Sequence, residues 1–119
     1  MSTIQNPNMT GEELDIIIAA AKAAAVMASQ AKFEAMGYVD GGTCGFGWTV
    51  IRGIKMNTKI GKLFKSRGLT KSYGETDITL WSPGQYTGQN IDVHEAGADA
   101  CAEVFEAAGF ESYGRSRAD

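Results

Sequence analysis

The sequence has few of the side chains that most often carry out chemistry: two cysteines, Cys44 and Cys101, and one histidine, His94. Two distant cysteines without a CxxC pair are too few for a disulfide scaffold, so we expect reduced thiols in a cytoplasmic protein. Two cysteines and one histidine also lack the spacing of a zinc site. His94 and Cys101 would lie two helical turns apart, about 10 Å, which is too far for a Cys–His nucleophilic pair. We therefore expect no catalytic residue, metal or cofactor, and do not predict an enzyme.

The chain also lacks the signals of export and membrane insertion. No basic segment precedes an apolar run at the N-terminus, as it would in a signal peptide. The longest apolar run, residues 16–31, is mostly alanine and is interrupted by Lys22, a weaker pattern than that of a membrane span. We expect no membrane association. The length of 119 residues predicts a single domain over 10–119, after a flexible lead of residues 1–9.

Charge is unevenly distributed along a chain with a formal net charge of −3. Residues 51–74, here called the basic segment, contain cations and no acid, whereas residues 92–111 contain acids and no Lys or Arg. The basic segment is a candidate site for a partner or an anion. Its cations are Arg52, Lys55, Lys59, Lys62, Lys65, Arg67 and Lys71.

Three interpretations of the basic segment stay open: a solvated helix face, a charge-matched protein contact, and nucleic-acid or nucleotide binding. Besides Phe64, which is expected to face the core, Tyr73 is the only aromatic residue of the basic segment, which is not the aromatic interleaving of a single-strand binder. The sequence pI of about 5.1 argues against a dedicated duplex binder.

The N-terminal half predicts a long helix and then a strand. Thr10 and Glu13 form a capping-box pattern, and Gly37 is a typical left-handed end, so we expect a helix over 10–36. This helix is apolar on all sides, which predicts a homo-oligomer, most simply a dimer, with the helix in the interface. The next stretch, residues 43–52, alternates as a strand does. We expect one face of it in the core and Gly45 and Gly47 on the other, where a neighbour can approach closely. The expected core face contains Cys44, Phe46, Trp48 and Val50.

The remaining pattern is a helix over 58–67, a strand over 76–81, a helix from Asp92 to Gly109, and a strand over 110–115. Asn57 and Asp92 are the expected N-caps. The order α-β-α-β-α-β predicts an α+β or small α/β domain, with a three- or four-stranded mixed sheet and helices on one face. Trp48, Phe46 and Trp81 are expected in the core beside Leu63 and Phe64. The glycines of GGTCGFG lack the following GK[ST] and helix of a phosphate-binding loop.

The C-terminal tail is a second candidate contact. In a strand, Tyr113, Arg115 and Arg117 share one face, where two forked guanidinium groups and a phenol, beside Tyr73 or Tyr86, would suit anion recognition. The alternative is a frayed, solvated terminus.

Several motifs together resemble a family of small proteins of tailed bacteriophages: CGFGW, NTKIGK, ITLW and the closing YGRSRAD. The resemblance covers about residues 10–119, and Glu75 and Thr76 depart from it where further glycine is typical. It implies a phage protein expressed in the bacterial cytoplasm, with the virion as an alternative location, and it assigns no catalytic residues.

Our leading functional hypothesis is a non-catalytic phage accessory protein that binds, and thereby inhibits, a host macromolecule, either a host protein or nucleic acid. One alternative is a virion-associated protein that self-assembles through residues 10–36. The other is a protein that sequesters a phosphorylated nucleotide signal.

Overall fold

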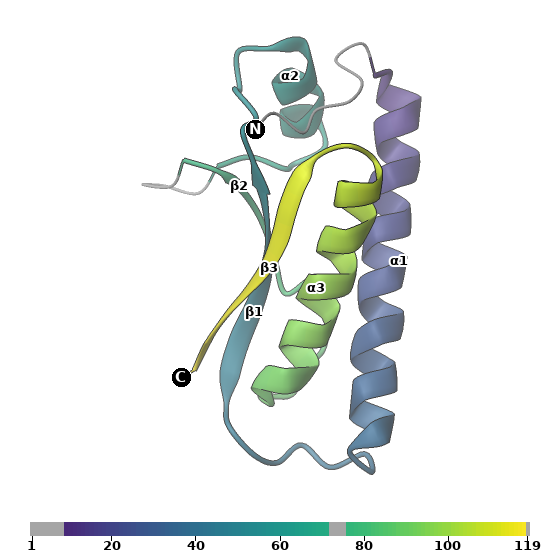
Figure 1. Ribbon diagram of the computed structural model, residues 1–119, viewed down its shortest axis with the longest axis vertical. Coiled ribbons are helices and arrows are strands. Elements are labelled where there is room, and N and C mark those ends of the chain that lie inside the picture. The colour runs from purple at the N-terminus through teal and green to yellow at the C-terminus, as the bar shows by residue number, and fades with distance from the viewer. Residues whose placement is uncertain (1–8, 72–75, 119) are drawn as a thin grey trace.

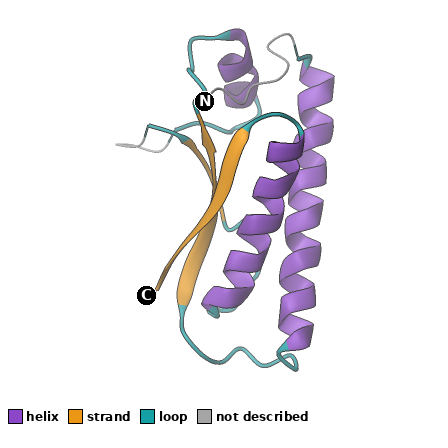
Figure 2. Ribbon diagram, in the orientation of Figure 1, coloured by secondary structure: helices purple, strands orange, loops and turns teal. Residues whose placement is uncertain are grey.

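The computed structural model describes residues 9–71 and 76–118 and forms one sheet backed by helices (Figures 1 and 2). The order is α1 (Gly11–Ala35), β1 (Gly45–Arg52), α2 (Lys59–Ser66), β2 (Ile78–Trp81), α3 (Ile91–Ala107) and β3 (Glu111–Ala118). This confirms the α+β class and the predicted order. The sheet of the described residues has three strands, ordered β2-β1-β3, and both pairings are antiparallel, so the sheet is not the mixed one that was predicted.

The long helices lie on one face of this sheet. In Figure 1, α3 runs along the sheet and α1 lies on the far side of α3. The shared core joins α1 to β1, β2 and α3, and Phe64 of α2 closes its end against Phe105 and Phe110. No helix of the described residues lies over the opposite face of the sheet (Figure 1).

The helix ends follow the sequence signals closely. Thr10 and Glu13 form the predicted capping box of α1, in which the backbone N–H of Glu13 donates to the Thr10 hydroxyl at 3.1 Å. Gly37, Gly68 and Gly109 all have positive φ just after a helix, as expected for left-handed C-terminal caps. Two N-cap predictions were wrong: the capping side chains are Thr58 for α2 and Asn90 for α3.

The predicted core face of the 43–52 strand was also wrong. The side of β1 that faces α3 holds Gly45, Gly47, Thr49 and Ile51, whereas Phe46 and Trp48 lie on the open side. A Cβ on Gly47 would lie 2.7 Å from the carbonyl oxygen of His94, so α3 occupies the space that a side chain would need. The predicted close approach to the two glycines is therefore confirmed, and this approach itself directs the large rings away from the core.

Trp81 and Cys44 were placed in the core by the same reasoning and are exposed instead. The predicted neighbours of the tryptophans, Leu63 and Phe64, remain in or against the core but pack without them. The core that replaces the predicted one is aliphatic and phenylalanine-rich. Its least accessible large side chains are Phe64, Phe105, Leu14, Ile51, Ile54 and Ile78.

The outward side of α1 is largely apolar and uncovered. Ile16 and Met27 are 70% and 71% exposed on it. By length and composition alone, α1 is long and apolar enough to cross a membrane, and 28% of its most apolar window is buried against the rest of the chain.

Candidate functional site: the open face of the sheet

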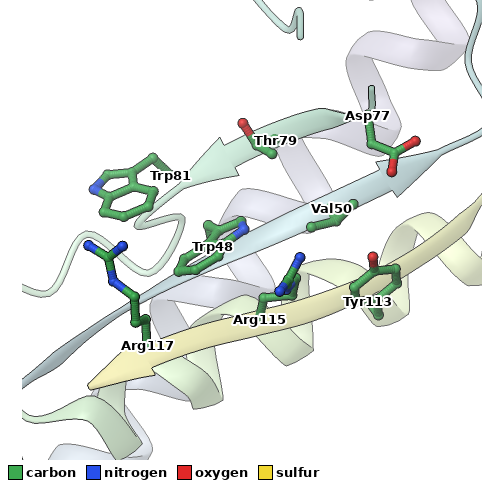
Figure 3. Close-up of a pocket in the computed structure, with 8 residues that line it drawn as sticks. All are labelled: Trp48, Val50, Asp77, Thr79, Trp81, Tyr113, Arg115 and Arg117. Carbon is green, nitrogen blue, oxygen red and sulfur yellow. The ribbon is translucent and has the colours of Figure 1, made fainter. Parts of the chain in front are cut away.

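The open face of the sheet carries a cluster of rings and arginines from all three strands. Figure 3 shows the two tryptophans, Tyr113 and the two arginines of this cluster on one side of β1, β2 and β3, around a pocket of about 370 Å³. We call the cluster the aromatic–arginine face. It consists of Phe46, Trp48, Trp81, Tyr113, Arg115 and Arg117.

The antiparallel register arranges these side chains in rows across the sheet. Trp48 lies opposite Trp81 on one side and Arg115 on the other, and Phe46 lies opposite Arg117. In the row beyond the tryptophans, Val50 lies between Thr79 and Tyr113. Side chains at alternate positions of a strand share a face, so the rows stand about 7 Å apart.

The rings contact one another. The Trp48 and Trp81 rings stack with centroids 5.1 Å apart and planes 17° apart, and the Phe46 ring lies 5.7 Å from that of Trp81. Trp81 is 59% exposed and Tyr113 39% exposed, whereas Phe46 and Trp48 are half-buried. The result is a connected aromatic surface in which Trp81 is the most exposed ring.

The two arginines stand over these rings and not beside acids. The guanidinium carbon of Arg115 lies 5.8 Å from the centroid of the Trp48 ring, and that of Arg117 lies 5.8 Å from the Phe46 ring. Within residues 9–71 and 76–118, neither arginine forms an ion pair with a carboxylate. This end of the face therefore holds two positive charges next to exposed aromatic planes.

The opposite end of the same face is electrically balanced. Arg52, at the end of β1, forms an ion pair with Glu111 at 3.1 Å and lies 3.9 Å from Asp77. The positive potential of the face is therefore concentrated around Arg115 and Arg117.

The basic segment is divided by the fold. Arg52 is engaged by Glu111 and Asp77, and Arg67 forms an ion pair with Asp15 of α1 at 2.8 Å, which raises the pKa of its guanidinium. Lys59, Lys62 and Lys65 are exposed on α2, as predicted, because Ile60 and Phe64 occupy its buried face. Lys55 is exposed as well, and Lys71 is half-buried, with its backbone bridged to Ile78. The α2 lysines follow the C-terminal end of β1, at the opposite end of the sheet from Arg117 (Figure 1).

The C-terminal tail is a strand, and Tyr113, Arg115 and Arg117 share one of its faces as predicted. The neighbours predicted for them were not correct. Tyr86 packs instead against Phe33 and His94 and donates a hydrogen bond to Asp40, far from this face. Tyr73 lies outside the described residues.

Asp40 anchors the loop before α3. Besides the Tyr86 phenol, its carboxylate accepts hydrogen bonds from the backbone N–H groups of Gln89 and Asn90, each at 3.1 Å. The Tyr86 hydrogen bond, followed by that of Gln89, lowers the pKa of Asp40. Burial, together with Asp40, raises the pKa of Tyr86 to about 12. These contacts hold a loop in place and bring no nucleophile to it.

The few reactive side chains lie apart from one another. Cys44 and Cys101 are both free, the first exposed and the second fully buried, and burial raises the pKa of the Cys101 thiol. The His94 ring is hydrogen-bonded through Nε2 to the carbonyl oxygen of Gly88 at 3.0 Å. Within residues 9–71 and 76–118, no group of three His, Cys, Asp or Glu side chains is placed to hold a metal ion.

Sequence reasoning found the arginines and Tyr113 of this face but missed Phe46, Trp48 and Trp81. The sequence did contain a signal for the rings of β1. Residues 45–49 alternate glycine or threonine with large rings, and the side with the small residues can be buried against a helix as readily as the side with the rings. Comparisons of the chain with protein-family models, curated proteins and solved structures find no match.

Proposed function

We propose that this protein is a non-catalytic binding module whose aromatic–arginine face contacts an anionic partner. The observation that carries this proposal is the position of Arg115 and Arg117, which stand over aromatic rings without a carboxylate partner in the described chain. A cation held in this way is kept on the surface and is available to an incoming anion. Trp, Tyr and Arg are also the residues in which binding energy is most often concentrated.

The resemblance to tailed-phage proteins favours a setting for this activity. A phage-encoded binding module would act in the bacterial cytoplasm, and its partner would be a host macromolecule that is inhibited by being bound. Shielding of a host component needs only affinity and an accessible surface, which suits a chain with few reactive side chains.

The basic segment is the competing site, and the two can be separated by mutation. In the proposed arrangement, Arg115→Glu combined with Arg117→Glu removes capture of the partner from a bacterial lysate. Reversal of Lys59, Lys62 and Lys65 to Glu is the matched control, because these side chains are equally exposed but lie on α2. Captured material is identified by mass spectrometry and by nucleic-acid staining. Capture that survives the arginine reversal and disappears with the lysine reversal would move the site to α2.

A second candidate function is sequestration of a phosphorylated nucleotide. The pocket beside Trp48 and Arg115, at about 370 Å³, is within the size range of small-ligand sites. Heating the purified protein and analysing the supernatant for nucleotide tests this candidate directly.

A further inference from the structure

We infer that the aromatic–arginine face binds single-stranded nucleic acid, with unpaired bases stacked on its rings and backbone phosphates held by Arg115 and Arg117. This inference rests on the proposed function and names the class of its partner. A base and a phosphate each require a different chemical surface, and the face supplies both side by side.

The rings provide the surface for the bases. Trp81 exposes most of its side chain, and it is joined to Trp48 and Phe46 by ring contacts of 5.1 Å and 5.7 Å. Every base has a π-face, so stacking on such rings tolerates any sequence. In sheets that recognise RNA, two or three bases stack on exposed aromatic side chains of the central strands.

The arginines provide the contacts for the phosphates. Both belong to β3, an edge strand of the sheet, whereas the tryptophans belong to β1 and β2. Arg115 and Arg117 are two residues apart, which places them about 7 Å from each other along the strand. They can therefore meet two different phosphates of an extended strand while its bases point across the sheet toward Trp81. A guanidinium group binds phosphate through two parallel N–H donors.

The shape of the face excludes a duplex as the preferred ligand. Groove recognition requires a helix or a two-stranded ribbon narrow enough to enter the major groove. Here the rings lie on a three-stranded sheet backed by α3, and stacked base pairs offer them no free base plane. The chain as a whole is acidic, at −3, so it also lacks the general positive charge that drives duplex binding.

The composition of the face favours nucleic acid over a protein partner. Its exposed apolar surface consists of aromatic rings, and its one aliphatic side chain, Val50, is only 4% exposed. Aromatic residues and arginine are also enriched in protein interfaces, but the core of such an interface is depleted of charged residues. Arg115 and Arg117, which have no carboxylate partner in the described chain, match the phosphates of a single strand, and the exposed rings beside them match its bases.

The site is short. Beyond the Val50 row, the charge of Arg52 is taken up by Glu111 and Asp77. On the other side of the sheet, α3 carries three acidic side chains close together: Glu95, Asp99 and Glu103. Partial burial, followed by the charges of its two acidic neighbours, raises the pKa of Asp99. Nucleic acid is therefore attracted to one end of one face, where two to three nucleotides fit.

The test uses the full-length protein and fluorescein-labelled DNA and RNA single strands of mixed sequence, about 8 nucleotides long. Binding is followed by anisotropy and, in parallel, by quenching of the protein's tryptophan fluorescence. Two phosphate contacts predict that log K falls with log [salt] with a slope of about −1.4, and that Arg115→Gln or Arg117→Gln each removes about 0.7 of it. Trp81→Ala should weaken binding about 5- to 150-fold, and Trp81→Phe much less, because phenylalanine still stacks.

Tyr38→Ala is the matched control for Trp81→Ala, since Tyr38 is an aromatic residue that is 65% exposed just after α1, away from the sheet face. Melting temperatures near that of the wild type ensure that each variant is folded. The inference is overturned if no strand binds, if duplex binds as tightly as single strand, or if Trp81→Ala has no effect. A nucleoside triphosphate that competes as well as the strand would also overturn it, in favour of a mononucleotide ligand.

Failure of the inference is distinguishable from failure of the proposed function. If no single strand binds but the Arg115→Glu and Arg117→Glu variant still loses its lysate partner, only the assignment to nucleic acid is wrong. If the arginine reversal changes neither strand binding nor capture of the lysate partner, the inference and the proposed function are both wrong.

Discussion

Trp48 and Trp81 are direct cross-strand partners on β1 and β2, and their rings stack on the face of the sheet that none of the three described helices covers. Two tryptophans in a chain of 119 residues would ordinarily be assigned to the core. Here they lie outside it, because α3 packs directly on the glycine side of β1. The stacked pair is therefore available for binding, and its loss should affect affinity much more than stability.

Stability should depend on the phenylalanines and not on Trp81. Phe64→Ala removes a fully buried ring that contacts Phe105 and Phe110, and should lower the free energy of unfolding by about 3–5 kcal/mol. Trp81→Ala should cost only about 1 kcal/mol, the size of an exposed cross-strand aromatic pair. Urea unfolding curves measure both. Similar losses for the two variants would mean that the tryptophans are part of the core.

The close contact between α3 and β1 should make Gly47 intolerant of a side chain. In Gly47→Ala the new methyl group would lie 2.7 Å from a backbone oxygen of His94, so α3 must move, at a cost of about 1–3 kcal/mol. Gly41→Ala is the matched control, because its nearest neighbour would be a Val39 methyl at 3.7 Å and its φ is not positive. Equal melting temperatures for the two variants would contradict the close packing.

The hydrogen bond between Tyr86 and Asp40 should give stability that depends on pH at both extremes. Because the folded state lowers the pKa of Asp40 below its ordinary 3.8, this contribution is present above that pH and is lost as pH falls through the lowered value. Because it raises the pKa of Tyr86 from 10.0 to about 12, the contribution is also lost as pH rises through that interval. In Tyr86→Phe the Asp40 pKa, followed by NMR, should move up toward 3.8. An unchanged value would show that the phenol does not contact the carboxylate.

The outward side of α1 should mediate self-association. Ile16 and Met27 are each about 70% exposed on a helix whose neighbouring outward residues are mostly alanine, so a second copy can approach closely. Light scattering should return a dimer for the wild type and the 12.7 kDa monomer for Ile16→Glu combined with Met27→Glu. A wild-type monomer at micromolar concentration would contradict this. Flotation with lipid vesicles tests the other occupant of this face, since α1 is also long and apolar enough to span a membrane.

Local signals in the sequence predicted much of the fold. The Thr10–Glu13 capping box and the glycine that follows each helix depend on a few adjacent residues, so these helix ends can be predicted without knowing the tertiary structure. The shared face of Tyr113, Arg115 and Arg117 follows from the period of a strand.

The orientation of β1 could not be predicted in this way. Its two faces are Phe46–Trp48–Val50 and Gly45–Gly47–Thr49–Ile51, and neither is polar enough to identify the solvent side. The choice is made by a distant element: α3 packs on the glycines, and Thr49 Oγ1 donates a hydrogen bond to the carbonyl oxygen of Ala98 at 2.8 Å. Local periodicity gives no information about a contact between residues 49 positions apart. Phe46 and Trp48, which contribute rings to the site, were therefore predicted to lie in the core.

Photo-crosslinking of a labelled single strand, followed by mass spectrometry of the crosslinked peptides, tests most directly which surface makes the contact. The account predicts crosslinks to Trp81 of β2, to Phe46 and Trp48 of β1, and to Tyr113 of β3, reduced as salt rises. Crosslinks confined to α2, around Lys59 to Lys65, would contradict it and return the binding site to the basic segment.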